Sequence, residues 1–406
     1  MGQVVRGGEQ FETAIQSDYR GRIIKQGPDS GAVDAFGRQR VSQPFTLFDS
    51  VLRHSKNAEL WNETISGGTS THLPNESSVL MTVTASGHSV LRRSRKRFPY
   101  QPGKGLNVLQ SFAGSTLQNG LIKELGLFDN NNGIMLRASG TTIQFVIRSS
   151  TNGSPVETVV NQSEWNIDTA PWLDFSKTNI FATDLEWLGV GRVRCGFVLD
   201  GEYYYCHEFN HANNLDVVYM TTAVLPLSYG IRAMATVSGS MKQICSHVSV
   251  DGGYEPAGAI YVTGRGASNF TAISAETMVA AIRMASGRTD NVILPSQVDV
   301  SIGGNPASNV AAQWRMRLNP IVSGAWLEAT NGRGNVQTMS SGTFSGGTVI
   351  NAGLVASRGS VEFNPQRALD LALGTNAAGE SDIVILTIQC SSSEDATGLL
   401  GWREVL

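Results

Sequence analysis

One stretch of sequence limits the fold more than any other, because it contains a complete three-strand pattern. Residues 179–209 read NIFATDLEWLGVGRVRCGFVLDGEYYYCHEF, with apolar and polar side chains alternating over three runs. The runs are separated by residues 189–191 (GVG) and by the dipeptide Asp200-Gly201. An Asp-Gly pair between alternating runs is a strong signal for a two-residue hairpin, since both residues tolerate positive φ. The stretch therefore predicts three consecutive antiparallel strands.

The rest of the chain repeats this pattern of short alternating runs, for example in residues 77–86 and 141–150. Charged residues make up only 16% of the chain and glycines number 44, which is typical of short strands joined by turns. Residues 278–285 have helix propensity, but we expect a strand there because their surroundings are β-rich. Residues 365–373 (PQRALDLAL), with Pro in the first turn, are the best helix candidate. We predict an all-β fold.

Glycine and proline divide this pattern into three parts. Residues 1–38 are polar, lack a long apolar period, and are predicted to be an extended N-terminal arm that lies on a neighbouring molecule or frays. The sequence DGGYEPA at 251–257 looks like a domain junction. We therefore expect a lectin-like jelly-roll β-sandwich over 39–254 and a second antiparallel β-sandwich over 255–406.

Several of these stretches together resemble a known family. The sequences TDLEWLGVGRVRCGFVLDGEYYYCHEFNHANN, DAFGRQRVSQPFTLFDS, HLPNESSVLMTV and RFPYQPGK are similar to virion structural proteins of tailed bacteriophages, known best from environmental and marine phages. The resemblance covers residues 34–253 and continues more weakly to LLGWRE at 399–404. The hairpin pair also resembles the strand–Asp-Gly–strand unit of concanavalin A-like jelly rolls.

The phage resemblance implies a role in a particle. It implies a non-enzymatic structural component, tail-associated as a fibre, baseplate or adaptor protein, that assembles in the host bacterial cytoplasm and is located in the virion. The implied partners are other virion structural proteins and further copies of the chain, with a trimer as one option. The alternative is a host-surface glycan-binding module of a tail or head fibre.

Charge, hydropathy and cysteine content exclude other classes. A net charge of −3 gives no global basic field for nucleic acid, and no apolar run is long enough for a transmembrane helix. The four cysteines, widely spaced and without a C-x-x-C motif, favour synthesis in a reducing cytosol. We expect no cofactor.

One dense basic cluster, LRRSRKRFPY, is a candidate contact with a neighbouring subunit or a polyanion. Alternation places its basic side chains on both faces of a strand. Contact with acidic protein or acidic polysaccharide, nucleic-acid binding, and a charged edge strand that resists aggregation all remain open. The candidate residues are Arg92, Arg93, Arg95, Lys96 and Arg97.

Aromatic and amide side chains supply a candidate glycan contact, because sugars stack on rings and hydrogen-bond to amides. Trp172, Tyr203, Tyr205 and Asn213 are the candidates, and core or turn positions are the alternative.

Two further constellations are weaker candidates. Asp184 and Glu186 lie two apart on a predicted strand, so their carboxylates share a face, as acid–base pairs require, although plain alternation also places them outward. Cys206 and His207 are adjacent and point to opposite faces, which argues against a zinc site with Cys195 and His211. The sequence therefore predicts neither catalytic residues nor a metal site.

Overall fold

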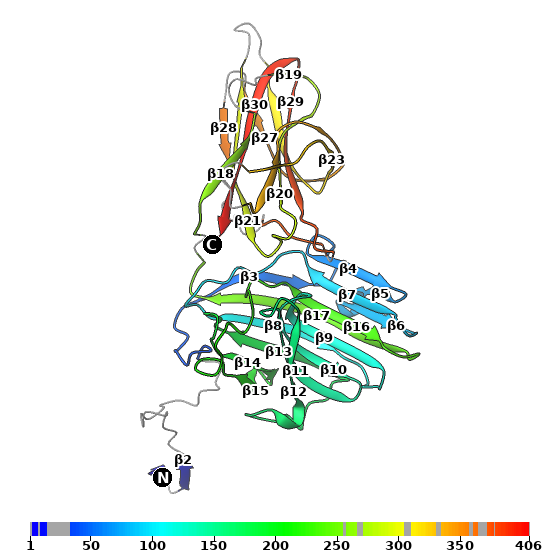
Figure 1. The fold of residues 1–406 in the computed structure, drawn as a ribbon, viewed down its shortest axis with the longest axis vertical. Helices are drawn as coiled ribbons and strands as arrows, with labels where there is room; N and C mark the ends of the chain where they lie inside the picture. Colours follow the sequence, from blue (N-terminus) through cyan, green and yellow to red (C-terminus); the bar gives the residue numbers. More distant parts are fainter. Residues whose placement is uncertain are drawn as a thin grey trace.

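Figure 1 shows the computed structural model, whose regular structure is almost entirely β-strand. It describes residues 2–6, 9–13, 33–254, 257–265, 271–303, 310–329, 334–356, 360–363, 372–376 and 378–405. Within these ranges the helical segments are two short 3-10 turns, η1 (Pro74–Glu76) and η2 (Gln162–Glu164). The strands pair antiparallel in both main pairs of sheets. The predicted all-β fold class is confirmed.

The first pair of sheets is built from β3 to β17. Seven strands form one sheet in the order β12-β11-β10-β9-β16-β7-β4. Their bounds are Val156–Asn161 (β12), Thr142–Ser149 (β11), Gly133–Ser139 (β10), Leu121–Phe128 (β9), Leu227–Ala233 (β16), Ser89–Ser94 (β7) and Trp61–Ser66 (β4).

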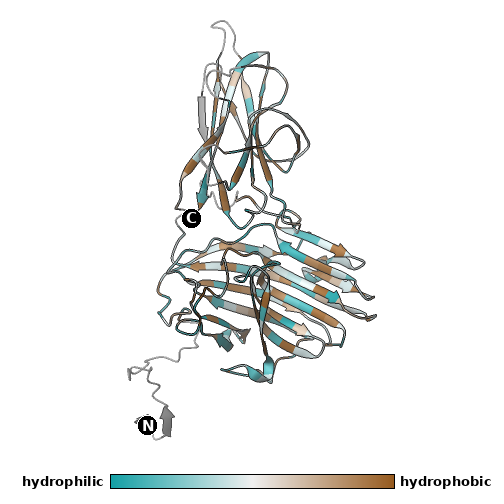
Figure 2. Cartoon of the chain, viewed as in Figure 1, coloured by the Kyte–Doolittle hydropathy of each residue, from teal (hydrophilic) through white to brown (hydrophobic). Residues whose placement is uncertain are grey.

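Eight strands form the sheet that faces it, in the order β15-β14-β13-β8-β17-β6-β5, with β3 also pairing with β17. Their bounds are Glu202–Phe209 (β15), Val193–Leu199 (β14), Thr178–Leu185 (β13), Leu106–Ala113 (β8), Gly239–Asp251 (β17), Ser78–Val83 (β6), Thr69–Leu73 (β5) and Pro44–Val51 (β3). Figure 2, which colours the backbone by hydropathy, shows hydrophobic and hydrophilic residues alternating along many of these strands.

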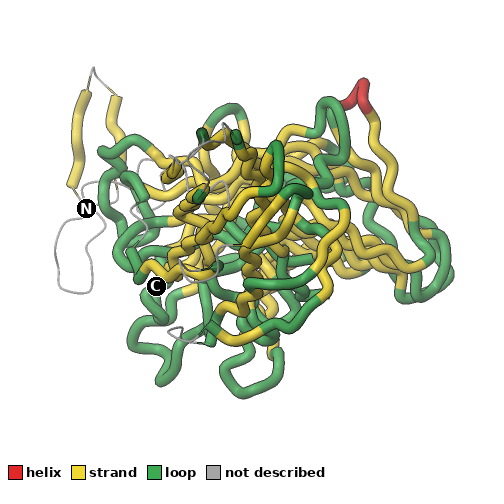
Figure 3. The backbone as a smooth tube through the Cα atoms, turned by 90° about the horizontal axis from the view of Figure 1, so that it is seen from above, coloured by secondary structure: helices red, strands yellow, loops and turns green. Residues whose placement is uncertain are grey.

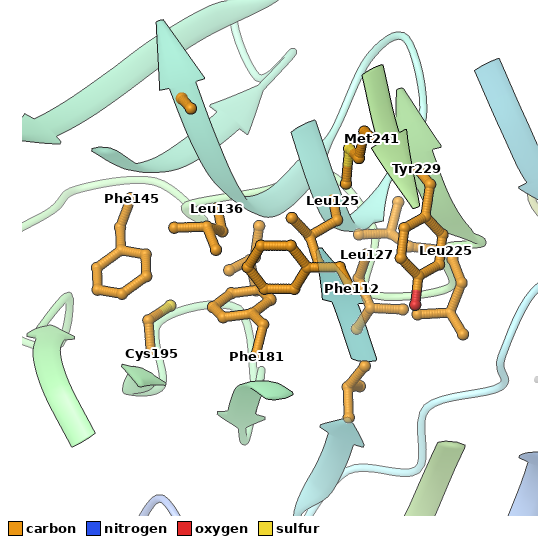
Figure 4. Packing of buried hydrophobic residues seen from close by; sticks show 14 of the residues in the cluster. Phe112, Leu125, Leu127, Leu136, Phe145, Phe181, Cys195, Leu225, Tyr229 and Met241 are labelled. Atoms are coloured by element: carbon orange, nitrogen blue, oxygen red, sulfur yellow. The ribbon is translucent and has the colours of Figure 1, made fainter. Parts of the chain in front are cut away.

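The core of this sandwich follows directly from that alternation. Phe112 and Phe181 of the eight-stranded sheet pack against Leu125, Leu136 and their neighbours from the seven-stranded sheet, and all are buried (Figure 4). Each fully buried large apolar side chain of this kind stabilises the fold by roughly 1.5–3 kcal/mol. The residues opposite in phase point away from the core, which gives each sheet an outer face.

The predicted three-strand unit is confirmed as β13, β14 and β15. Asp200 and Gly201 have φ values of 54° and 85°, as a two-residue turn between twisted strands requires. The connection between β13 and β14 turns even more tightly. A Cβ atom on Gly191 would lie 1.7 Å from the carbonyl oxygen of Glu186, so glycine is required there.

A short segment, 33–40, lies over the outer side of the eight-stranded sheet. Ala35 is completely buried, and its carbonyl oxygen accepts a hydrogen bond of 2.6 Å from Arg192 Nε. The predicted arm is otherwise described only as a hairpin of β1 (Gly2–Arg6) and β2 (Glu9–Thr13). Its residues 14–32 lie outside the described residues.

The second pair of sheets is built from β18 to β30. One sheet has the order β18-β30-β21-β28, with β19 pairing with β30. The bounds are Ile260–Gly264 (β18), Glu394–Val405 (β30), Val292–Ile302 (β21), Ser360–Phe363 (β28) and Thr271–Ile273 (β19).

The facing sheet has the order β24-β25-β20-β29-β22-β27, and a small β23-β26 hairpin accompanies it. The bounds are Leu327–Glu328 (β24), Val336–Met339 (β25), Thr277–Met284 (β20), Ile383–Cys390 (β29), Ala312–Leu318 (β22), Thr348–Val355 (β27), Ile321–Ser323 (β23) and Thr343–Ser345 (β26). The strand expected at 278–285 is therefore confirmed as β20. The helix candidate at 365–373 falls mostly outside the described residues.

A few polar contacts join the two sandwiches, which lie end to side in Figure 1. Arg95 Nη1 lies 3.0 Å from Asp382 Oδ1, and Asn62 Nδ2 donates to the carbonyl oxygen of Thr375 at 2.7 Å. Figure 3, seen from above, shows a backbone made almost entirely of strands and loops. None of the described helices is long and apolar enough to span a membrane.

Candidate functional site

A pocket of about 410 Å³ opens at one end of the first sandwich. It lies between the β11–β12 hairpin and the end of β15 with the connection that follows it. Its volume is within the range of small-molecule sites. The lining combines hydroxyl, amide and carboxylate groups with apolar and ring side chains: Ile147, Ser149, Thr151, Asn152, Val156, Thr158, Glu208, Phe209, Asn210, His211, Leu215, Val217, Val218 and Tyr219.

Stacked rings form the rigid part of this lining. His211 lies parallel to Tyr219, with ring centroids 3.9 Å apart, and also parallel to Phe209 at 6.4 Å. The Nδ1 of His211 donates to the carbonyl oxygen of Gly191 at 2.7 Å, which fixes the ring. Burial lowers the pKa of His211 below its usual range, so the imidazole is neutral at pH 7.

Glu208 provides the carboxylate of the pocket. Its Oε2 accepts from Arg192 Nη1 at 2.7 Å, and its Oε1 accepts from Asn210 Nδ2 at 2.8 Å. Each carboxylate oxygen has a second lone pair. Glu208 is therefore held in place and can still accept hydrogen bonds from hydroxyl groups of a ligand.

The predicted glycan contacts lie elsewhere and are not brought together. Tyr203 and Tyr205 are on the outer side of the eight-stranded sheet, where Tyr203 bonds to Asn107 and Tyr205 lies in contact with Arg194. Trp172 is partly exposed at the β15 edge, with its ring 6.2 Å from that of Tyr204.

Asn213 is exposed in the loop between two lining residues, with φ of 63°, but does not itself line the pocket. The sequence-based selection of glycan contacts therefore missed the pocket. The available signal was the run HEFNHANN, which ends β15 and continues beyond it; from this run the sequence analysis chose Asn213 as a glycan contact and considered the histidines only for an unfavoured metal site.

The residues of the predicted basic cluster do not form one surface: one is buried between the sheets, and others form ion pairs with separate carboxylates. Arg92 is completely buried between the sheets, where it pairs with Glu63 and donates to Gln243 Oε1 at 2.5 Å. Arg95 pairs with Asp382 of the second sandwich, and Arg97 pairs with Asp129 at 2.8 Å.

Lys96 is half-buried and has an interaction partner. Arg93 is 5% exposed and points to the outer side of the seven-stranded sheet, since it alternates with Arg92. The cluster as a whole is thus not one exposed basic patch, and any contact with a polyanion would have to rest on Arg93 and its surroundings.

The carboxylate pair Asp184 and Glu186 shares a face, as its spacing predicts, but that face is covered. Both side chains are fully buried beneath segment 33–40. Asp184 pairs with Arg194 and, at 2.7 Å, with Arg40 Nη2. Glu186 pairs with Arg38 at 2.6 Å, and burial nevertheless raises its pKa above the usual range. Alternation along the strand predicts that these groups point outward into solvent. They do point away from the core, but segment 33–40 covers them.

The cysteine and histidine residues considered for a zinc site do not share a partner. His207 Nδ1 accepts from the backbone N–H of Asn166 at 3.2 Å, whereas His211 bonds to Gly191. Cys195 and Cys206 are buried free thiols, and burial raises the pKa of Cys206 to about 12. Among the described residues, no group of three or more His, Cys, Asp or Glu side chains is arranged to hold a metal ion.

Comparison with solved structures finds jelly-roll enzymes. An endo-1,3-β-glucanase from Streptomyces sioyaensis is 10% identical, with a TM-score of 0.36, and the match covers 52% of this chain and 97% of that one. A glycoside hydrolase family 16 endo-glucanase from Bacteroides ovatus is 11% identical, with a TM-score of 0.36 and coverage of 50% and 99%. The Crh5 transglycosylase is 12% identical, with a TM-score of 0.32 and coverage of 56% and 89%.

No family model and no curated protein matches the chain. The likeness to the solved structures is therefore one of fold, the concanavalin A-like jelly roll that the hairpin pair predicts. The predicted non-enzymatic structural component of a phage particle has no counterpart among the matched structures, which are glucanases and a transglycosylase, and that prediction is not retained. The resemblance to phage virion proteins has no support in these comparisons.

Proposed function

We propose that the first sandwich is a carbohydrate-acting domain that takes a saccharide into the end pocket. The observation that carries this proposal is the mixed chemistry of the pocket lining. Saccharides present many hydroxyl groups next to apolar C–H faces. A site for them needs acceptors and donors fixed beside apolar walls, which is the usual composition of a specific small-molecule site.

Each part of the lining has a role in this proposal. Glu208, held by Arg192 and Asn210, accepts hydrogen bonds from sugar hydroxyls, and a charged acceptor makes such bonds stronger. The amide groups of Asn152 and Asn210 both donate and accept. Partly exposed apolar side chains, Leu215, Val217 and Val218, supply the wall against which a C–H face packs.

Binding should therefore depend on Glu208. We expect Glu208→Gln to weaken binding of neutral oligosaccharides by about tenfold or more, because a charge-assisted hydrogen bond is lost. The measurement is a glycan array followed by isothermal titration calorimetry of the full chain with the best oligosaccharide. The matched control is Glu76→Gln, which removes an exposed ion-paired carboxylate at η1, outside the pocket lining. Equal affinities for wild type and both variants would refute the pocket.

Cleavage of a glycosidic bond is a second candidate function, favoured by Asp184 and Glu186. Most glycosidases use two carboxyl groups roughly 5–10 Å apart, one of them kept protonated as a general acid. Residues two apart on a strand have Cα atoms about 6.5 Å apart and share a face. The raised pKa of Glu186, due first to burial, fits the acid, and Asp184, which pairs with Arg194, is the candidate second carboxyl group.

Segment 33–40 must move aside before this pair can meet a substrate. We expect release of reducing ends from β-glucan by the full chain to fall about a hundredfold or more in Glu186→Gln. Glu76→Gln serves again as the control. If wild type releases no reducing ends while binding persists, the domain binds without cleaving, and the carboxylate pair is structural.

A further inference from the structure

The outer side of the seven-stranded sheet holds a buried arginine that lacks an ionic partner. Arg93 is 5% exposed, and among the described residues it forms no ion pair. Its Nε donates to Ser228 Oγ and its Nη2 to Asn130 Oδ1, both at 3.2 Å, so both acceptors are neutral and the bonds are long. The remaining nitrogen, Nη1, has no hydrogen-bond partner among these residues and is not sealed from solvent.

Two more guanidinium groups surround the same loop. Arg97 Nη1 bonds to Asp129 Oδ2 at 2.8 Å, and Arg148 Nη1 bonds to the carbonyl oxygen of Asp129 at 2.6 Å. Arg148 also pairs with Glu157, which is shared with Arg137. The nearby carboxylates are thus already committed to other arginines.

This arrangement is unfavourable without a ligand. A buried cation with only neutral, long hydrogen bonds loses hydration that is not replaced. The pKa of Arg93 is lowered to about 10, chiefly by burial, while Asp129 raises it and Arg97 and Arg148 lower it. An anion bound at Nη1 would restore the missing partner.

We propose that Arg93, with Asn130 and the neighbouring Arg97 and Arg148, is a subsite for an oxyanion carried by the saccharide ligand. The inference rests on the proposed function and narrows it: the preferred glycan is acidic, bearing carboxylate or sulfate groups. A guanidinium offers a planar pair of donors that matches either group. Arg93 donates to Asn130 Oδ1 and so fixes the amide group, and the Nδ2 of the same amide can donate a further hydrogen bond to the anion.

The anion subsite is tested first without any glycan. We expect sodium sulfate, compared with sodium chloride at equal ionic strength, to raise the melting temperature of the wild-type full chain more than that of Arg93→Met, because only the native site binds sulfate. Arg53→Met is the matched control, since Arg53 is exposed in a loop of the same sandwich. General salting-in or salting-out acts on all three proteins equally. An equal sulfate effect in wild type and Arg93→Met overturns the subsite, whatever the glycan data show.

The second experiment asks whether the anion belongs to the glycan. The probes are a galacturonic acid hexasaccharide and its fully methyl-esterified form, in which each carboxylate is replaced by an uncharged methyl ester on the same sugar backbone. We expect wild type to bind the acid about tenfold more tightly than the ester, and Arg93→Met to bind both equally. Loss of the preference with retained ester binding supports the subsite and leaves the pocket intact. A wild type that binds both forms equally overturns the acidic-glycan inference.

If neither form binds but sulfate still protects the wild type selectively, the proposed saccharide function fails while the anion site stands. The melting curves in chloride report whether Arg93→Met folds. If it does not, Arg93→Lys replaces it, because Lys keeps the charge but loses the planar pair of donors. A sulfate effect unchanged in the lysine variant would then contradict the guanidinium geometry.

Discussion

The two outer sides of the first sandwich carry the same kinds of charged residue, but their counter-charges come from different places. On the eight-stranded sheet, Asp184 and Glu186 meet Arg38 and Arg40, which the chain itself supplies from segment 33–40. On the seven-stranded sheet, the arginines other than Arg93 are partnered by carboxylates of the same sheet and its loops, such as Glu124 with Arg137 at 2.6 Å. No described segment lies over them in the way that 33–40 covers the opposite side.

The balance of charge on the two sides differs accordingly. The covered side gathers five carboxylates around four arginines: Asp34, Asp184, Glu186, Glu208 and Asp251 with Arg38, Arg40, Arg192 and Arg194. The uncovered side gathers five arginines around three carboxylates: Arg93, Arg97, Arg137, Arg148 and Arg232 with Asp129, Glu124 and Glu157. A surplus of cations on the uncovered side leaves a place for an external anion, which is why we locate the oxyanion subsite there.

The variant with the largest expected effect removes the carboxylate of Asp184 from the covered side, and it tests whether that side is buried in solution. Asp184→Ala leaves the fully buried Arg194 and the largely buried Arg40 without their shared carboxylate. Breaking a buried pair by removing one partner costs about 3–5 kcal/mol. We expect a loss of that size in the free energy of unfolding, measured by urea denaturation at pH 7.

The control for this variant is Glu76→Ala, which breaks the exposed pair with Lys242. An exposed pair contributes about 0–1 kcal/mol. Equal losses in the two variants would show that the covered side is solvated in solution, and that segment 33–40 does not stay on the sheet.

Local patterns made the strands predictable. The period-2 alternation and the Asp200-Gly201 turn are properties of adjacent residues, so β13, β14 and β15 could be read directly from the sequence. Alternation also indicates correctly that Arg92 and Arg93 lie on opposite faces. It cannot say that Arg92 points inward, because its partner Glu63 lies on β4, another strand of the same sheet.

The candidate sites depended on contacts between distant segments. The pocket joins residues of β11 and β12 to residues 208–219, and no single stretch contains both halves. Segment 33–40 has no apolar period, so its position over Asp184 and Glu186 had no local signal. The function expected from the resemblance to phage proteins rested on sequence stretches that build strands and turns, and such stretches describe architecture and not the side chains of a site.

On the uncovered side, we expect a smaller loss of stability when the carboxylate of Glu157 is protonated or removed. Glu157 accepts hydrogen bonds from both Arg137 and Arg148, at 2.7 and 2.8 Å, and chiefly the Arg137 bonds lower its pKa from 4.5 to about 2. A carboxylate whose pKa is depressed by folding stabilises the protein above its unfolded pKa, and this stabilisation is lost as pH falls from about 4.5 towards 2. The shift alone corresponds to about 3 kcal/mol, and partial exposure of Glu157 reduces this to about 1–2 kcal/mol.

We therefore expect Glu157→Gln to lose about 1–2 kcal/mol of unfolding free energy at pH 7 and to lose less than wild type on acidification to pH 3. Urea denaturation at both pH values measures the two differences. The same variant also frees Arg137 and Arg148, so the cationic surplus beside Arg93 increases. If that surplus attracts oxyanions, sulfate should protect Glu157→Gln at least as well as wild type, and weaker protection would mean that Glu157 orders the arginines for the anion rather than competing with it.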